Sequence, residues 1–194
     1  MHQMLIDMPA KLETERLILR CYKYGDGKVY YSMLNENIEH LKKYDNDRLF
    51  TIKSEDEAEI YIRELISDWY ARKRFVLGVW EKNSKKFVGE IWIEANNWED
   101  RIFEIGWFAE KGNTGRGYVT EAAKASLKLI FEVFGGHKVV VTAEDSNQRS
   151  YSVAERCGFL KEGHFREQKR YKDGSWHGTL YYGLLKNEYE KIYY

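Results

Sequence analysis

The stretch Gly115-Arg116-Gly117-Tyr118-Val119-Thr120-Glu121-Ala122-Ala123 joins a predicted strand to a predicted helix. The strand is expected over residues 101–109. Downstream, apolar residues recur at steps of three and four, as on the buried face of a helix: Ala123, Leu127, Ile130, Phe131 and Phe134. The N–H groups of such a turn lie at the positive end of the helix dipole, and glycine lets a ligand approach without meeting a Cβ atom. The stretch therefore predicts an anion site, with phosphate as the expected ligand.

Two familiar phosphate motifs do not fit this turn. A P-loop closes with Gly-Lys-Ser/Thr, whereas Gly117 is followed by Tyr118 and Val119. A dinucleotide-binding turn needs a third glycine where this chain has Thr120, and it opens a βαβ unit near the start of the fold. Because a Gly-x-Gly pair alone is a weak signal, a turn that binds no ligand stays open as the alternative at this point.

Composition narrows the class of protein. The 194 residues suit one α/β domain spanning residues 1–194. Lys plus Arg (31) equals Asp plus Glu (31), so no overall field attracts nucleic acid or an anionic membrane. No run of about 18 apolar residues is present, and the N-terminus is too short and polar for a signal peptide. The two cysteines form no disulfide framework, and the five histidines lack the spacing of metal ligands. We expect a soluble, cytoplasmic protein without a metal.

The other elements follow from periodicity and from turn and cap residues. The predicted strands are residues 14–22, 75–81, 87–94 and 138–144, and a closing hairpin pairs residues 163–171 with 176–185. Residues 25–43 are irregularly helical, and Asp45-Asn46-Asp47 is a loop. A capping box at Ser54 opens a second helix, and Asp145-Ser146-Asn147 offers caps for a short helix that runs to Cys157.

That order of elements resembles the GNAT superfamily of acyl-CoA N-acyltransferases. The family's coenzyme motif, Gln/Arg-x-x-Gly-x-Gly/Ala, maps onto residues 114–119, with Thr114 and Val119 departing from it. Further matches are Glu104-Ile105-Gly106-Trp107, Asn147-Gln148-Arg149-Ser150, Glu155-Arg156-Cys157-Gly158-Phe159, the opening 12–20 and the closing 181–189. Together they look like the branch of ribosomal-protein N-terminal acetyltransferases. The resemblance implies an α/β fold whose central, mostly antiparallel sheet splays between strands four and five and is flanked by helices.

The resemblance also implies roles for particular residues. Acetyl-CoA is the expected cosubstrate, its pyrophosphate bound by the backbone of Gly115, Arg116, Gly117, Tyr118, Val119 and Thr120. Backbone N–H groups near Trp107 and Phe108 would face the thioester oxygen. Asn147 would hold the pantetheine arm, with a plain helix cap as its alternative. Ser150 would protonate the leaving thiolate, with a helix-capping hydroxyl as its alternative. Glu104 is the predicted general base, with an ordinary solvent-facing strand residue as its alternative.

The acceptor amine is the least determined part. Residues 22–47 and the 172–175 hairpin region are expected to wall its side of the site. Neither Cys21 nor Cys157 has a nucleophile's setting, so direct transfer in a ternary complex is expected rather than an acetyl-enzyme. The favoured acceptor is the N-terminal α-amine of a ribosomal protein. A small-molecule amine acetyltransferase (polyamine, amino sugar or antibiotic) and a non-catalytic acyl-CoA-binding module remain open, and a homodimer is expected.

Overall fold

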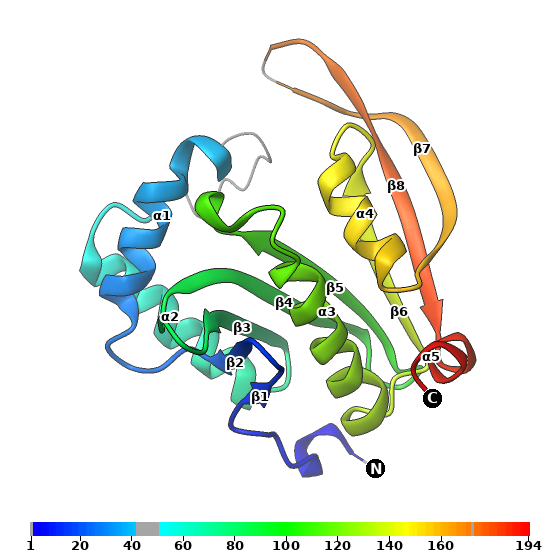
Figure 1. Cartoon of the computed structure of the whole chain (residues 1–194), viewed down its shortest axis with the longest axis horizontal. Helices are drawn as coiled ribbons and strands as arrows, with labels where there is room; N and C mark the ends of the chain where they lie inside the picture. The colour runs from blue at the N-terminus through cyan, green and yellow to red at the C-terminus, as the bar shows by residue number, and fades with distance from the viewer. Residues whose placement is uncertain (1, 42–50, 172) are drawn as a thin grey trace.

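The computed structural model describes residues 2–41, 51–171 and 173–194. Figure 1 shows the chain running from the N-terminal strands to a helix at the C-terminus. The strands are β1 (Leu12–Glu13), β2 (Leu17–Cys21), β3 (Arg74–Glu81), β4 (Phe87–Asn97), β5 (Ile102–Ala109), β6 (Lys138–Glu144), β7 (Leu160–Arg170) and β8 (Trp176–Leu185). The helices are α1 (Gly27–Leu41), α2 (Glu55–Tyr70), α3 (Tyr118–Lys128), α4 (Gln148–Arg156) and α5 (Lys186–Tyr193). Short 3₁₀ turns η1 (Gln3–Leu5) and η4 (Lys111–Asn113) and the π-helical segment η5 (Leu129–Val133) complete the order.

All the strands named above join one sheet in the order β1-β2-β3-β4-β5-β6-β8-β7. Every neighbouring pair is antiparallel except β5 and β6, which run parallel. The parallel pair is short, because it extends only from Ile102 opposite Lys138 to Glu104 opposite Val140. Beyond that register the two strands diverge, and the molecule opens between them (Figure 1). The predicted mostly antiparallel sheet, splayed between its fourth and fifth predicted strands, is therefore confirmed.

Helices cover both faces of the sheet, and each face has its own apolar cluster. The larger cluster joins the sheet to α3, η5, α4 and α5 and includes Trp69 of α2, and the smaller one joins it to α1 and the rest of the buried face of α2. Strand β5 shows which residues face which side. Phe103 and Ile105 belong to the larger cluster, whereas Phe108 packs against the smaller one. Since side chains alternate along a strand, Glu104 lies on the α1–α2 face.

The predicted helix caps are present with one difference. Ser54 caps α2 by accepting a hydrogen bond from the Glu57 backbone at 3.1 Å. The reciprocal bond is shifted by one residue, because the Glu57 carboxylate accepts from the backbone N–H of Lys53 at 2.6 Å. Ala58, Ile62, Leu65 and Trp69 form the buried face of α2, as their spacing predicts.

Several elements differ from the sequence-based expectation: β1 is a separate strand that was not predicted, and β4 continues to Asn97 instead of ending at residue 94. Strand β7 begins at Leu160, three residues before the predicted start, and α5 was not predicted. The helix after the glycine turn leaves α-helical geometry at Leu129 and continues as η5. The loop expected at residues 45–47 lies outside the described residues. Within the described ranges, none of the helices has the length and apolar character needed to span a bilayer.

Candidate active site

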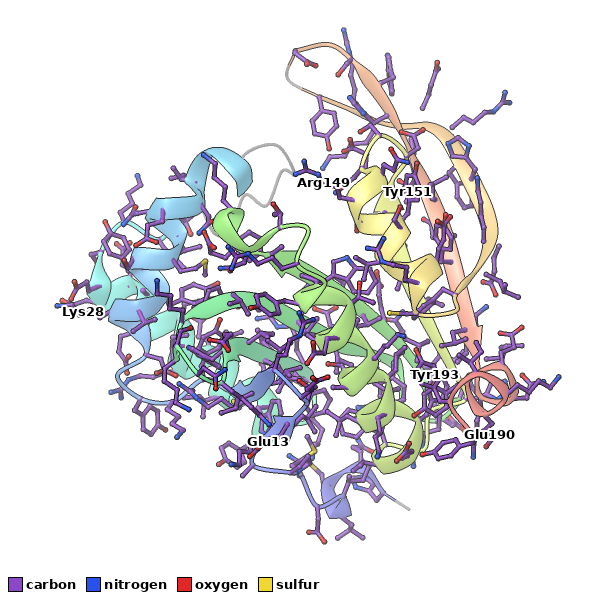
Figure 2. All side chains as sticks on the ribbon, viewed as in Figure 1. Glu13, Lys28, Arg149, Tyr151, Glu190 and Tyr193 are labelled. Carbon is purple, nitrogen blue, oxygen red and sulfur yellow. The ribbon has the colours of Figure 1, made fainter. Side chains whose placement is uncertain are left out.

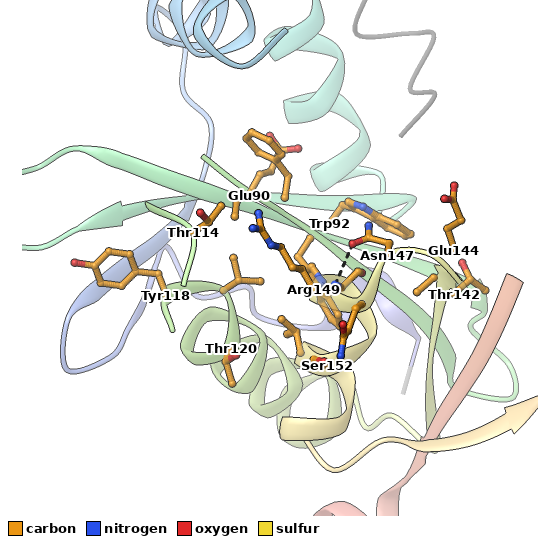
Figure 3. Close-up of a pocket in the computed structure, with 18 of the residues that line it drawn as sticks. Glu90, Trp92, Thr114, Tyr118, Thr120, Thr142, Glu144, Asn147, Arg149 and Ser152 are labelled. Carbon is orange, nitrogen blue, oxygen red and sulfur yellow. Dashed lines mark hydrogen bonds between the residues drawn. The ribbon is translucent and has the colours of Figure 1, made fainter. Parts of the chain in front are cut away.

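A cavity of about 1160 Å³ opens where β5 and β6 diverge (Figure 3). Its walls come from β4 and β5, from the end of β6 and the start of α4, and from the turn before α3. Most residues selected from the sequence line this one cavity: Trp107, Phe108, Gly115, Gly117, Tyr118, Val119, Thr120, Asn147 and Ser150. Glu104 and Arg116 are the two selected residues that do not line it.

The glycine turn is built to receive an anion. Gly115 and Gly117 both have φ of +78°, a backbone conformation that L side chains rarely adopt. Gly117 is the N-cap of α3 and offers no side-chain hydrogen bond to the helix. The first backbone bond of the helix runs from Glu121 N–H to the Gly117 carbonyl at 3.0 Å. The N–H groups of the residues between them therefore have no partner within the helix and are available to a phosphate group.

One cation that sequence reasoning missed stands close to this turn. Arg149, the second residue of α4, is exposed and lines the cavity. Its side chain reaches from α4 toward Thr114 on the opposite wall (Figure 3). Arg149 and Tyr151 leave α4 on opposite sides (Figure 2), and Tyr151 does not line the cavity. A guanidinium at the mouth adds positive charge beside the turn, which fits a ligand with several phosphates.

The start of α4 carries both polar residues expected there. The Asn147 side-chain oxygen accepts a hydrogen bond from the Ser150 backbone N–H at 3.2 Å, so Asn147 is the N-cap of α4 (Figure 3). The bond uses the side-chain oxygen of Asn147, a residue that also lines the cavity. Ser150 lines the same wall. A capping role and a ligand-binding role for Asn147 thus use different atoms.

Strand β5 supplies backbone groups to the opposite wall. Trp107 and Phe108 pair with Ile91 and Glu90 of β4 on one side. On the other side the ladder with β6 ends at Glu104. Backbone groups of β5 beyond that point have no strand partner on the β6 side and can bond a ligand carbonyl in the opening.

Glu104 does not line the cavity itself, but it accepts a hydrogen bond at 3.0 Å from the hydroxyl of Thr142, which does. The aromatic residues Phe103 and Trp107 project to the other face of β5 and do not enclose its carboxylate. Glu104 is therefore one hydrogen bond away from the cavity. Its role as general base remains a sequence-based prediction.

Glu90 of β4 is the carboxylate that the cavity does contain. Tyr22 donates a hydrogen bond to it at 2.7 Å from the end of β2. Desolvation raises the pKa of Glu90 to about 7, against the opposing effects of the Tyr22 bond and the positive charge of Arg74. Glu90 is half-buried because one side faces the cavity, while the rest of the side chain is enclosed by protein. A carboxylate with this pKa can accept a proton at neutral pH.

Trp92 forms the floor beside Glu90 and depends on a glycine across the sheet. Gly106 pairs with Trp92 in the β4–β5 ladder. A Cβ atom at Gly106 would lie 2.1 Å from the Trp92 ring, so only glycine lets the indole lie across β5. Tyr30 and Met33 of α1 complete this side of the cavity. The α1 segment expected to wall the acceptor side is therefore present, although Tyr44 lies outside the described residues.

A second carboxylate, Glu144, lies at the end of β6 in a network of hydrogen bonds. The Tyr171 hydroxyl donates to it, and His177 Nδ1 lies 3.1 Å from its Oε1 atom. His177 Nε2 in turn lies 2.9 Å from the Ser175 hydroxyl. Glu144, Tyr171 and His177 all line the cavity, so the base of the β7–β8 hairpin contributes a polar wall. Trp176 is instead 55% exposed and lies outside the lining.

The cysteines take no part in this site. Neither Cys21 nor Cys157 lines the cavity, and burial raises the pKa of each thiol to about 11. A protonated, buried thiol is a poor nucleophile. Among the described residues no group of His, Cys, Asp and Glu could hold a metal ion.

The chain is similar to known proteins over most of its length. A family model described as "Acetyltransferase (GNAT) domain" matches residues 16–160. A Bacillus subtilis relative, "Putative ribosomal N-acetyltransferase", is 28% identical over 180 residues, 91% of this chain and 95% of that protein. A spermidine N(1)-acetyltransferase from Vibrio cholerae is 25% identical over 82% of this chain and 90% of that protein. A solved ribosomal α-N-protein acetyltransferase in complex with coenzyme A superposes with a TM-score of 0.81, at 18% identity, over 90% of this chain and 97% of that one.

Proposed function

We propose that this chain, which belongs to the GNAT acetyltransferase family and transfers an acetyl group from acetyl-CoA to an amine, acts on the N-terminal α-amine of a protein. A ribosomal protein is the first candidate. The observation that carries the proposal is the position of Glu90, a carboxylate with a pKa of about 7 in the cavity that also contains the glycine turn. The turn provides the coenzyme site, and Glu90 provides a base on the acceptor side.

The coenzyme site of this proposal uses backbone more than side chains. The pyrophosphate is bound by the N–H groups of residues 115–120, with Arg149 as an added cation at the mouth. Asn147 holds the pantetheine arm through its amide N–H groups. Of the two departures from the family motif, Val119 still offers its backbone N–H to the diphosphate, whereas Thr114 precedes the residues whose N–H groups are the proposed ligands.

In the proposed reaction Glu90 takes a proton from the acceptor ammonium, directly or through one water. The neutral amine then attacks the thioester carbonyl carbon, and the oxygen that gains charge is stabilised by backbone N–H groups of β5 that face the opening beyond the end of the β5–β6 ladder. The C–N bond forms, the carbonyl is restored as the C–S bond breaks, and the attacking nitrogen releases its second proton to water to give the amide. Ser150 donates its hydroxyl proton to the departing thiolate and regains a proton from solvent.

The pKa of Glu90 favours an α-amine over a more basic amine. An α-amino group has a pKa of about 7.7–8.0, whereas an alkyl ammonium such as the lysine side chain has one of about 10.4. A base with a pKa of about 7 is matched to the first group within roughly one unit, so proton transfer is nearly balanced at neutral pH. Transfer of a proton from the alkyl ammonium to Glu90 is unfavourable by roughly three pKa units.

A polyamine is the second candidate, and a separate observation favours it. Glu90 and Glu144 both line the cavity, one on each side of the opening between β5 and β6. Two carboxylates in one site suit an acceptor with a second ammonium group. The spermidine acetyltransferase among the relatives is consistent with this choice.

Release of free coenzyme A thiol from acetyl-CoA, measured against a matched set of acceptors, tests the proposal. The set contains a peptide with a free α-amine, the same peptide blocked at its N-terminus but carrying a lysine, and spermidine. The proposal expects the free peptide to be acetylated with the highest kcat/KM. Preference for spermidine would select the second candidate instead.

The homodimer and the cytoplasmic location stay predictions from the sequence. Strand β7 is exposed along its length and forms an edge of the sheet, where a second copy would cover unpaired backbone groups. Sedimentation at working concentration tests the dimer, and a monomeric protein would contradict it.

A further inference from the structure

A carboxylate occupies the first turn of α3, next to the proposed pyrophosphate site. Glu121 begins the hydrogen-bonded part of the helix, four residues after Gly117. Although burial alone would raise it, the hydrogen bonds that Thr14 and Arg16 donate hold the pKa of Glu121 below its usual value. The side chain is therefore charged at neutral pH. A bare negative charge at this place would repel a diphosphate bound to the same helix end.

Arg16, just before β2, neutralises that charge. Its Nε and Nη2 atoms each lie 2.6 Å from Oε2 of Glu121, a two-pronged contact, and its backbone N–H donates to Oε1 at 3.0 Å. Thr14 donates to the same Oε1 at 2.5 Å. Both oxygens of the Glu121 carboxylate are thus engaged by the segment before β2, and the charge is balanced there rather than by a ligand.

The same guanidinium also holds the glycine turn. Its Nη1 atom donates to the carbonyl oxygen of Arg116 at 3.1 Å, and the group lies over the Tyr118 ring, 4.8 Å from the centroid. In a trans peptide the carbonyl and the following N–H point in opposite directions. Drawing the Arg116 carbonyl toward Arg16 therefore turns the N–H of Gly117 away from Arg16. Gly117 lines the cavity and Arg116 does not, in agreement with this orientation.

We propose that Arg16 is a positioning residue for coenzyme binding, which aims the N–H of Gly117 at the pyrophosphate and cancels the charge of Glu121. This inference rests on the proposed coenzyme site at residues 115–120. Arg16 itself touches no reacting atom, since its contacts are to the back of the turn. Its loss should weaken the binding of the diphosphate part of the coenzyme and leave the chemistry of acetyl transfer unchanged.

Three variants separate the two effects of Arg16. Arg16→Ala removes both the charge and the bond to the turn, and we expect the Kd for coenzyme A to rise about tenfold, the size of one partly screened charge interaction. Arg16→Lys keeps the positive charge but loses the bidentate geometry of the guanidinium, so the Kd for coenzyme A should rise less. Arg16→Ala combined with Glu121→Gln removes the uncompensated charge, and part of the lost affinity should return.

The discriminating readout uses S-acetylpantetheine, a thioester that lacks the diphosphate and the nucleotide. Calorimetry gives the Kd for coenzyme A, and turnover with each thioester gives kcat/KM. We expect Arg16→Ala to lower kcat/KM for acetyl-CoA about tenfold and to leave that for S-acetylpantetheine within about twofold of the native value. Equal losses with both thioesters would mean that Arg16 only supports the fold, and the inference would be overturned. An unchanged Kd for coenzyme A would overturn it as well.

Two controls isolate the inference. Arg20 of β2 makes a similar two-pronged ion pair, at 2.7 and 3.2 Å to Asp26, but it lies away from the turn. Arg20→Ala should leave the Kd for coenzyme A unchanged. Gly117→Val blocks the turn itself and should raise that Kd. If Gly117→Val leaves the Kd for coenzyme A unchanged, the proposed coenzyme site is wrong. If Gly117→Val raises that Kd and Arg16→Ala does not, only the role of Arg16 is wrong. If Arg16→Ala is unfolded at the assay temperature, Arg16→Lys replaces it in the test. The same comparison of kcat/KM for acetyl-CoA with kcat/KM for S-acetylpantetheine then decides the role of Arg16.

Discussion

Replacing Glu90 with glutamine tests the proposed base through turnover and stability together. The amide introduced by Glu90→Gln has the shape of the native side chain and can still accept the hydrogen bond of Tyr22, but it cannot take a proton. We expect kcat to fall by roughly 10²-fold or more, the lower range for removing a general base. The variant should bind coenzyme A normally, because Glu90 lies on the acceptor side of the cavity.

The pH dependence follows from the raised pKa of Glu90. With a pKa of about 7, the native carboxylate is mostly protonated at pH 5.5, so its ionised fraction, and with it its contribution to kcat/KM for the acceptor, should rise roughly thirtyfold between pH 5.5 and pH 8. In Glu90→Gln the inflection near pH 7 should disappear, and only the rise from deprotonation of the free acceptor amine, with its pKa of about 7.7–8.0, should remain. Stability has the opposite sign: because the folded pKa is raised from 4.5, the contribution of Glu90 is fully present below pH 4.5 and is lost as the pH rises through 7. Glu90→Gln should therefore be more stable than the native protein at pH 8, by about 3 kcal/mol at most.

Glu104→Gln is the matched control on the neighbouring strand and the same face of the sheet. It removes the other proposed base but lies outside the cavity lining. We expect its kcat and pH profile to match those of the native protein. A full rate and an unaltered profile in Glu90→Gln, with a loss in Glu104→Gln, would refute the reasoning and return the base to Glu104.

Three further variants test the walls of the cavity. Gly106→Ala should displace Trp92, because the new Cβ would lie 2.1 Å from its ring, and should raise KM for the acceptor while the Kd for coenzyme A stays unchanged. Ser150→Ala should slow turnover by roughly 10²-fold with an unchanged melting temperature, whereas earlier melting with a normal rate would leave it only a capping role. Asn147→Ala should cost about 1 kcal/mol of stability, as loss of the α4 cap, and should also weaken coenzyme binding in a calorimetric titration.

The sequence could predict the parts of the site that depend on local signals. The turn at Gly115 and Gly117 needs only glycines between a strand and an amphipathic helix, and the caps at Ser54 and Asn147 need only one side chain and the next turn. These features lie within a few residues of one another. Their positions in the structure agree with the expectation because no distant segment decides them.

Glu90 could not be singled out in this way. It occupies an ordinary polar position in a strand that alternates, and its raised pKa comes from burial by segments far along the chain. Tyr22, which donates to it, is 68 residues away in sequence. The ion pair of Arg16 with Glu121 joins residues 105 positions apart, so it too could not be predicted from local sequence signals.

The C-terminal helix α5 shows a second limit. It has eight residues, a single buried one in Tyr189 and few apolar positions, so periodicity gives little signal. What holds it is tertiary: Tyr189 stacks on Phe131 with ring centroids 4.5 Å apart, and its hydroxyl donates to Glu132 at 2.8 Å. Both partners lie in η5, which the sequence predicts only as an extension of α3.

The most direct test of the central claim is the release of coenzyme A thiol from acetyl-CoA at neutral pH, with mass spectrometry of the acceptor. The native protein should acetylate a peptide at its free α-amine, should leave the N-terminally blocked peptide with its lysine unmodified, and should act on spermidine with a lower kcat/KM. Thiol release that depends on spermidine but not on the free peptide would contradict the α-amine assignment.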